Sequence, residues 1–350
     1  QIRTPPPRAH VSSPTLGAAG FPSPRSSHTP PRAARAAADR PWTGVAASPS
    51  HPLVLTVPRG SDAVPISVGE IDDNGEAVPY PNAEMNAWQK GENPAGKFVC
   101  VQSVYVDDVG RLWVLDPAEV WPDGIVPGGA RLFEFDLATD TVVRTIVFDD
   151  AIVTQTSYLN DVRVDTETNT AFITDSGNGA IIVVDLTSNE ARRLLDDHFS
   201  TDPEDIVVTV GDVPFDQPVA SDGIALDTDG GWLYYQALTG RTLYRVPTAA
   251  LRDSRLTDAE LAAEVERVAE SGVSDGLLFT EDGIYVSALE SNIIRLVKEK
   301  HVVSTVIEDT RILWPDSFAR EPDGSILFTT SQIHLENPTE PYRIYRITTD

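Results

Sequence analysis

The chain repeats one short sequence pattern along most of its length, and this repeat limits the possible folds more than any other feature. Each copy has a short alternating run, a polar turn that usually contains Asp or Gly, and a second β-rich run. This is the pattern of a β-hairpin. A weaker copy begins at Thr43, and clear copies begin at Gln102, Asn160, Asp222, Asp275 and Asp316. We therefore expect six related β units.

The spacing of the copies indicates how each unit is built. The copies recur about every 55 residues, and one hairpin uses only about fifteen of these. Further β-rich runs, such as residues 180–186 and 241–246, provide about two more strands for each unit. The sequence therefore predicts an all-β fold, a six-bladed β-propeller over residues 42–350. A pair of β-sandwich domains is the alternative, but such domains would not repeat the same hairpin pattern at this regular spacing.

The first 41 residues do not share the repeat. They are rich in Pro, Ala, Ser and Arg, and residues 1–40 hold six arginines and a single acid, Asp39. This composition lacks apolar periodicity, so we expect no packed unit here. An Arg- and Ser-rich segment with few acids is typical of a transit peptide, and a plain disordered leader is equally consistent with it.

One helix is expected inside the β repeat. The sequence T-D-A-E at 257–260 is a capping box, and Leu261, Val265 and Val268 follow at helical spacing before Gly272. We predict a short surface helix at 258–270, inserted between blades and packed on the rim.

Composition excludes several classes of function. The formal net charge is −26, and because the leader is basic, the remainder of the chain is more acidic still. Such a surface repels phosphate backbones, so we expect no nucleic-acid partner. No apolar run approaches the roughly 18 residues of a membrane span.

Cys100 is the single cysteine, so no internal disulfide forms, and its β-rich surroundings predict a buried, inert thiol. We expect no organic cofactor.

Polar residues recur at one position of the repeat. The innermost strand of each propeller blade runs along a central channel, so equivalent residues form a ring at one channel mouth. Asn160, Asp222, Asp275 and Asp316 hold this position, with Gln102 at the equivalent place in the second blade. Converging oxygen groups suit a hard cation such as Ca²⁺ or Mg²⁺, and they suit an amine-bearing ligand equally well.

These residues also have a purely structural interpretation, because Asp-Gly and Asn-Asp at strand entries form Asx turns. For the set as a whole we favour the functional interpretation. We expect the acids in the hairpin turns and at strand ends to be solvated and without a role in the site: Asp107, Asp165, Asp227 and Asp282.

The string G-V-S-D-G at 272–276 matches the nucleophile elbow of serine hydrolases. That motif needs a strand before the serine and a helix after it. Here a predicted helix comes before Ser274 and a β run follows. We therefore interpret Ser274 and Ser221 as blade-entry residues, and we assign no catalytic residue.

Several stretches, in order, resemble the major royal jelly protein/yellow family, and the resemblance is closest to its microbial branch. They are F-V-C-V-Q-S-V-Y-V-D-D-V-G-R-L-W-V-L-D (98–116), S-Y-L-N-D-V-R-V-D (157–165), S-D-G-I-A-L-D (221–227), S-D-G-L-L-F (274–279) and W-P-D-S-F-A (314–319). The resemblance covers about residues 42–347. Met85 departs from it, because the family usually has Trp there.

The family is similar in fold to the gluconolactonase/regucalcin group, in which a divalent metal activates a water that attacks a lactone. By position, this resemblance implies Asn160, Asp222 and Asp275 as metal ligands. The first-blade Glu ligand of the gluconolactonase/regucalcin group has no match in W-T-G-V (42–45). Yellow-type proteins imply instead dopachrome isomerisation or amine binding, and secretion.

Three functions remain open at this stage. The first is a propeller that binds a small cationic or catechol-like ligand at the acidic channel mouth, with isomerase activity as an option. The second is a lactone hydrolase dependent on Ca²⁺ or another divalent metal. The third is a non-catalytic scaffold that uses its acidic surface and basic leader as contact regions. Secretion and organelle targeting both remain open, and the sequence leaves the oligomeric state undetermined.

Overall fold

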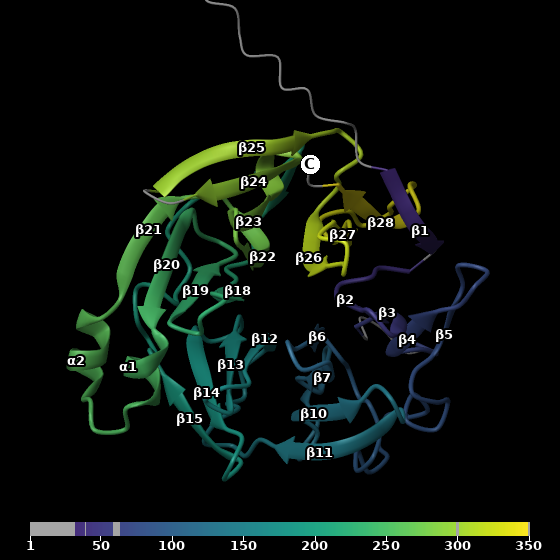
Figure 1. The fold of residues 1–350 in the computed structure, drawn as a ribbon, viewed down its shortest axis with the longest axis horizontal. Coiled ribbons are helices and arrows are strands. Elements are labelled where there is room, and N and C mark those ends of the chain that lie inside the picture. The colour runs from purple at the N-terminus through teal and green to yellow at the C-terminus, as the bar shows by residue number, and fades with distance from the viewer. Residues whose placement is uncertain (1–31, 39, 59–63, 299–300, 349–350) are drawn as a thin grey trace, which may run out of the picture.

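A computed structural model describes residues 32–38, 40–58, 64–298 and 301–348 of the chain. It contains six four-stranded antiparallel sheets, arranged as blades around one axis (Figure 1). The predicted six-bladed β-propeller is therefore confirmed. Within the described residues, no helix has the length and apolar character needed to cross a membrane.

The innermost strand of each blade comes from one copy of the sequence repeat. These strands surround the axis in chain order (Figure 1). They are β2 (Val45–Ser48), β6 (Ser103–Val106), β12 (Leu159–Asp165), β18 (Ser221–Leu226), β22 (Ser274–Thr280) and β26 (Pro315–Arg320).

The second strand of each blade pairs with the first through a short turn, so each predicted hairpin is present. These strands are β3 (His51–Thr56), β7 (Arg111–Asp116), β13 (Thr170–Asp175), β19 (Trp232–Ala237), β23 (Gly283–Ala288) and β27 (Ile326–Thr330). In the third blade every residue of both inner strands is buried. This follows from the stacking of blades face to face, which buries both faces of the inner strands.

The third strands lie farther from the axis, and the fourth strands form the rim. The third strands are β4 (Val68–Ile71), β10 (Arg131–Asp136), β14 (Ala180–Asp185), β20 (Thr242–Pro247), β24 (Ile293–Lys298) and β28 (Tyr342–Ile347). The rim strands are β5 (Ala77–Pro79), β11 (Thr141–Val147), β15 (Glu190–Leu194), β21 (Glu266–Glu270), β25 (Val302–Glu308) and β1 (Arg32–Ala38). Two small hairpins, β8 (Glu119–Val120) with β9 (Gly124–Ile125) and β16 (Val208–Val210) with β17 (Val213–Phe215), lie in the connections.

The strand β1 closes the ring, and it corrects the predicted leader. Its residues pair with β28, from Arg32 opposite Arg346 to Ala38 opposite Tyr342. The last blade therefore combines a rim strand from the start of the chain with three strands from its end. Residues 32–38 belong to the propeller and not to the leader predicted for 1–41, while residues 1–31 lie outside the described residues.

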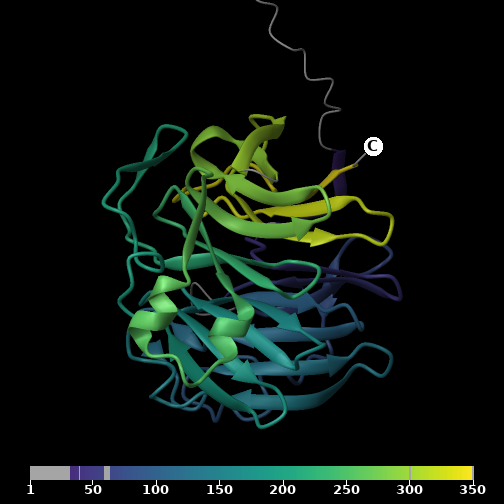
Figure 2. The same cartoon turned by 60° about the vertical axis from the view of Figure 1, so that its left-hand side comes forward.

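The predicted helix at 258–270 is only partly correct. The helix α2 spans Asp258–Ala263 and begins with the predicted capping box between Thr257 and Glu260. Residues Glu266–Glu270 form β21, because the edge of β20 offers them backbone partners. A second helix, α1 (Thr248–Arg252), precedes α2, and a short 3₁₀ turn, η1 (Leu289–Ser291), occurs in the next blade. Both α-helices lie at the rim within the fourth blade, not between two blades (Figures 1 and 2).

The core is divided among the interfaces between blades. Between the first and second blades, for example, Val54 and Val68 pack in one cluster with Phe98, Phe133 and Phe135. The rings of Phe98 and Phe133 pack edge to face, with their centroids 5.4 Å apart. Aromatic packing of this kind stabilises each interface and holds the inner strands in a fixed ring.

Candidate functional site

A bulge interrupts the inner hairpin at the same place in four successive blades. In the third to sixth blades, two residues of the innermost strand face one residue of the second strand. The first residue of each pair is one of the residues expected in the ring: Asn160, Asp222, Asp275 and Asp316. Because a β-bulge bends the strand and redirects a side chain, the bulges give these four residues a common environment.

The second residue of the bulge explains the Asp-Gly repeats. A Cβ atom on Gly223 would lie 2.1 Å from the carbonyl oxygen of Asp275, and one on Gly276 would lie 1.9 Å from that of Asp316. Neither site has room for a side chain, because the neighbouring inner strand lies directly against it. Glycine therefore lets the blades approach closely, and the acids before it are brought together.

Hydroxyl groups opposite the bulges tie the blades to one another. The Thr174 hydroxyl accepts the N–H of Asp161, at 3.2 Å, and donates to the carbonyl oxygen of Asp222 in the next blade, at 2.6 Å. Thr329 joins the last blade to the first in the same way, through its bond to the Thr43 carbonyl oxygen at 3.0 Å. Each hydroxyl satisfies a bulge amide that the ladder leaves unpaired.

The four bulge residues form one buried cluster. Their exposed fractions are 7% for Asn160, 3% for Asp222, 7% for Asp275 and 3% for Asp316. The Asn160 Nδ2 donates to Asp222 Oδ2 at 2.8 Å, and Trp314 Nε1 donates to Asp275 Oδ2 at 2.6 Å. The four residues at this position of the repeat are therefore buried side chains.

Burial and mutual repulsion change the titration of these carboxyl groups. Burial raises the pKa of Asp222 well above its usual value, and the charges of Asp275, Asp161 and Asp316 raise it further. Burial also raises the pKa of Asp275 to about 7, against the opposing effect of its bond from Trp314. The pKa of Asp316 is raised well above its usual value by burial and by the charge of Asp275. At neutral pH the cluster therefore retains protons.

A hydrogen bond between Asp222 and Asp275 raises the pKa of Asp222 and lowers that of Asp275. The two carboxyl groups therefore interact and titrate together. Among the described residues, no Lys, Arg or His forms an ion pair with Asp222, Asp275 or Asp316.

Two charged residues of the cluster were not anticipated from the sequence. Asp161, the second bulge residue of the third blade, accepts the Ser103 hydroxyl at 2.7 Å and lies 3.7 Å from the Arg163 guanidinium. Arg163 crosses to the fifth blade, where it donates to the Leu277 carbonyl oxygen at 3.0 Å, and it lies over the Tyr105 ring. Both residues line a cavity of about 370 Å³, whose other lining residues come mainly from the inner strands β2, β6, β22 and β26.

Gln102 lies beside the cluster rather than within its hydrogen bonds. Its Oε1 accepts the Tyr158 hydroxyl at 2.8 Å. Tyr158 is close enough to the cluster that the charge of Asp222 contributes to raising the pKa of its phenol, although burial is the largest cause.

An aromatic stack covers Trp314, the donor to Asp275. Phe215 of β17 meets the indole edge-on, with centroids 5.1 Å apart, and His334 stacks on it at 5.6 Å. Trp314 itself has no exposed surface. The β16–β17 hairpin and the segment after β27 therefore both contact the residue that orients Asp275.

The remaining predictions have mixed outcomes. Ser274 is fully buried and donates to the Gly276 carbonyl oxygen at 3.3 Å, in agreement with a blade-entry role. Cys100 is buried, as expected. Asp107 lies in a hairpin turn and Asp165 at a strand end, as predicted, but they are only 6% and 7% exposed, so the prediction that they are solvated is wrong. Their oxygens accept hydrogen bonds within the turns, such as that from the Arg111 N–H to Asp107 at 2.8 Å.

The first-blade Glu of the metal set that the resemblance implies has no counterpart at this site. In the part of the chain that the structure describes, no group of three or more His, Cys, Asp or Glu side chains could hold a metal ion. The first-blade position holds Thr43, whose hydroxyl lies 3.1 Å from the Thr56 hydroxyl and 3.2 Å from the Gln102 carbonyl oxygen. Asp222 Oδ2 and Asp275 Oδ2 both accept N–H donors, as described above.

Solved structures share the fold of this chain at low sequence identity. A gluconolactonase from Xanthomonas campestris superposes with a TM-score of 0.58 at 11% identity, over 92% of this chain and 96% of that one. Virginiamycin B lyase from Staphylococcus aureus has a TM-score of 0.52 at 12% identity, over 89% and 96%. At these identities the likeness establishes the propeller fold alone.

Sequence comparisons identify the family. Major royal jelly protein 9 of Apis mellifera is 28% identical over 200 residues, which are 54% of this chain and 46% of that protein. Protein yellow of Drosophila melanogaster is 25% identical over 230 residues, 59% of this chain and 41% of that protein. The matches thus span less than half the length of these relatives. The model of the major royal jelly protein family matches residues 99–312, and this chain therefore belongs to the major royal jelly protein family.

Proposed function

We propose that this protein binds a small organic cation, an amine, at the cluster formed by Asn160, Asp222, Asp275 and Asp316. The observation that carries the proposal is an imbalance of buried charge. Three carboxyl groups lie together with raised pKa values, and the nearby guanidinium of Arg163 is directed to a fourth carboxylate, Asp161. A bound ammonium group would replace protons that the cluster otherwise retains.

The hydrogen bonds of the cluster support an organic cation more than a metal ion. Ca²⁺ takes six to eight oxygen ligands, and Mg²⁺ demands six in near-octahedral geometry. Here Asn160 and Trp314 direct N–H groups at the two central carboxyl groups, so part of their oxygen surface is already engaged. An ammonium group needs only two or three acceptors and tolerates looser geometry.

A thermal-shift experiment tests this proposal. The probes are 2-phenylethylamine and its neutral analogue 2-phenylethanol, which have nearly the same shape and differ in charge. At pH 8 the amine is expected to raise the melting temperature and the alcohol to leave it unchanged, because stabilisation follows binding to the folded state. Equal effects of the two probes, or none from either, would contradict the proposal.

A double variant and a matched control test whether the amine binds at the carboxyl cluster. Asp222→Asn/Asp275→Asn keeps the size of both side chains and removes their charge, so the amine-induced shift is expected to disappear. The matched control is Asp150→Asn, an exposed carboxylate, which is expected to keep the shift. An amine shift that persists in the double variant would place amine binding elsewhere on this acidic protein.

The metal-dependent lactone hydrolase is the second candidate, supported by the fold of the gluconolactonase and by the position of Asn160, Asp222 and Asp275. Elemental analysis of the purified protein distinguishes the two. Stoichiometric Ca²⁺, Mg²⁺, Mn²⁺ or Zn²⁺, together with loss of stability in EDTA, would favour the hydrolase. A metal-free protein whose stability is insensitive to EDTA would favour the amine.

Isomerase activity and a scaffold role remain lesser alternatives, since no residue of the cluster is assigned to either.

Family membership also leads us to propose an extracellular location. Assay of the medium and of the cell fractions for the full-length product tests that proposal, and retention in an organelle would favour a targeting role for residues 1–31.

A further inference from the structure

A histidine at the junction of the first and second blades lies between two carboxyl groups. His51 begins β3 in the first blade, and its Nε2 lies 3.0 Å from Asp140 Oδ1 and 3.7 Å from Glu70 Oε2. Glu70 belongs to β4 of the same blade, whereas Asp140 lies in the turn between β10 and β11 of the second blade. Only 8% of the His51 side chain is exposed. The imidazole therefore joins the two blades at a nearly buried contact.

The hydrogen-bond partners of His51 indicate how many protons its ring carries. The Nδ1 atom lies 3.3 Å from the Pro52 carbonyl oxygen, and the Nε2 atom lies against the Asp140 carboxylate. Carbonyl and carboxylate oxygens only accept hydrogen bonds, so each ring nitrogen needs a proton to donate. Neutral histidine has one ring proton, and only the imidazolium form has two. The arrangement is therefore complete when His51 is positively charged.

His51 is also the only cation that balances these two carboxyl groups. Among the described residues, Glu70 and Asp140 form ion pairs with His51 and with no Lys or Arg. Loss of a proton from His51 would therefore leave two carboxyl groups without an opposite charge beside them. Because one of these groups belongs to the second blade, the attraction acts across the interface between blades.

The other titratable groups around the imidazole do not change charge in the same range. The ring of Tyr80 packs edge to face with the imidazole, with the centroids 5.2 Å apart. Burial raises the pKa of the Tyr80 phenol, and the charges of the nearby carboxyl groups raise it further, so the phenol stays neutral. Asp136, which also acts on Tyr80, is paired with Arg111. His51 is therefore the group here that loses or gains a proton near neutral pH.

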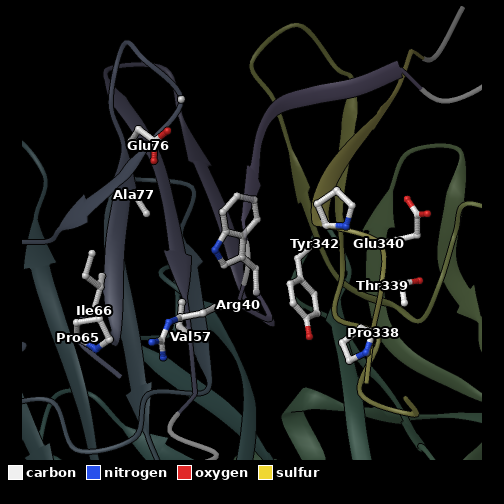
Figure 3. A pocket seen from close by; sticks show the side chains of 13 residues that line it. Arg40, Val57, Pro65, Ile66, Glu76, Ala77, Pro338, Thr339, Glu340 and Tyr342 are labelled. Atoms are coloured by element: carbon white, nitrogen blue, oxygen red, sulfur yellow. The ribbon is translucent and has the colours of Figure 1, made fainter. Parts of the chain in front are cut away.

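The position of the first blade gives this contact its importance. On the opposite side of that blade, a cavity of about 750 Å³ lies between the first and last blades. Figure 3 shows its two walls, with Ile66, Glu76 and Ala77 on one side and Pro338 and Thr339 on the other. The rim strand of the first blade, β5, has only three residues. We therefore expect contacts with the second blade to contribute strongly to holding the outer strands of the first.

We propose that His51 is a pH-sensitive link between the first and second blades. While both ring nitrogens carry protons, His51 attracts Asp140 across the interface, and the attraction is lost when one proton leaves. A histidine in an unfolded chain loses this proton near pH 6.5. Because the folded state holds the proton more tightly than the unfolded state, the link stabilises the protein at acid pH and is lost as pH rises. This link is independent of the carboxyl cluster and of the function proposed for it.

NMR of the full-length protein with nitrogen-15-labelled histidine tests the proposal. Long-range correlation spectra from pH 5 to pH 9 report which ring nitrogens carry protons, and His51→Gln assigns the His51 signals. In Asp140→Asn the second proton of His51 is expected to leave at a pH lower by roughly half a unit or more, because a neutral amide does not stabilise the imidazolium. Asn also tolerates the positive φ of 53° at this position. The control Asp150→Asn, an exposed carboxylate, is expected to leave this midpoint unchanged.

Urea denaturation of the wild-type protein, both single variants and His51→Gln/Asp140→Asn measures the coupling between the two side chains. At pH 5.5 the coupling is expected to favour folding by roughly fivefold, the upper range for a partly exposed ion pair, and at pH 9 by less than about twofold. Equal coupling at the two pH values would overturn the proposal. So would a second proton that leaves His51 at the same pH in the wild-type protein and Asp140→Asn, or an equal shift in Asp150→Asn.

Discussion

Replacement of Asp275 by Asn is expected to change how the stability of the protein depends on pH. The carboxyl group is 7% exposed, and its pKa is raised from 3.8 to about 7, chiefly by burial. The unfolded chain releases this proton near pH 4, while the folded chain holds it until about pH 7. The folded state therefore binds more protons between these values, and the free energy of unfolding falls as pH rises through this window.

The size of the effect follows from the shift in pKa. Each pKa unit corresponds to about 1.4 kcal/mol, so a shift of roughly three units lowers the stability of the wild-type protein by up to about 4 kcal/mol between pH 4 and pH 8. An Asn side chain has nearly the size of the acid and carries no charge, and its oxygen can accept the Trp314 N–H. The variant is therefore expected to lose much less stability over the same range.

Urea denaturation at pH 4.5, 6, 7 and 8 measures this difference. The advantage of Asp275→Asn over the wild-type protein is expected to grow with pH, and the exposed control Asp150→Asn is expected to follow the wild-type profile. Parallel profiles for Asp275→Asn and the wild-type protein would refute the inference that burial raises the pKa of this carboxyl group in the folded state.

Two further predictions concern the contacts that bring the blades together. Gly276→Ala is expected to destabilise the protein by about 1–3 kcal/mol or more in urea denaturation, because its Cβ would overlap a carbonyl oxygen 1.9 Å away. Gly231→Ala, where the nearest atom is 3.6 Å away, is its control, and an equal loss in both would contradict the close approach of the inner strands. Thr174→Val removes the hydroxyl that joins the Asp161 amide to the Asp222 carbonyl oxygen, and it is expected to cost about 1–3 kcal/mol. A stability within 0.5 kcal/mol of wild type, roughly the range of a neutral surface change, would show that water replaces this hydroxyl.

The sequence predicts the propeller well because its signal is local. Each inner hairpin carries its own alternation and turn residues, so the six copies can be recognised without knowledge of the other strands. The strand β1 has no such signal: R-A-A-R-A-A-A lacks the β-branched and aromatic residues that favour strands, and its strand form comes from pairing with β28. Likewise, residues 266–270 have helical spacing, but the open edge of β20 decides their structure.

The sequence indicates which residues make up the candidate site, but it does not show how deeply they are buried. The repeat places Asn160, Asp222, Asp275 and Asp316 at one register, and this register is confirmed by the shared bulges. Their burial depends on how closely the blades approach, which the sequence shows only through the adjacent glycines. Asp161 and Arg163 could have been found from the sequence. Residues two positions apart on a strand point to the same face, so two such charged residues on an innermost strand both face the channel.

The most direct test of the amine proposal is calorimetric titration of the wild-type protein with 2-phenylethylamine at pH 6 and pH 8, in buffers of different ionisation enthalpy. If the ammonium group replaces protons of the carboxyl cluster, binding is tighter at pH 8 and releases protons at pH 6. Both effects are expected to be absent in Asp222→Asn/Asp275→Asn. Binding with the same affinity at both pH values and no proton release, or equal binding by the double variant, would contradict the account.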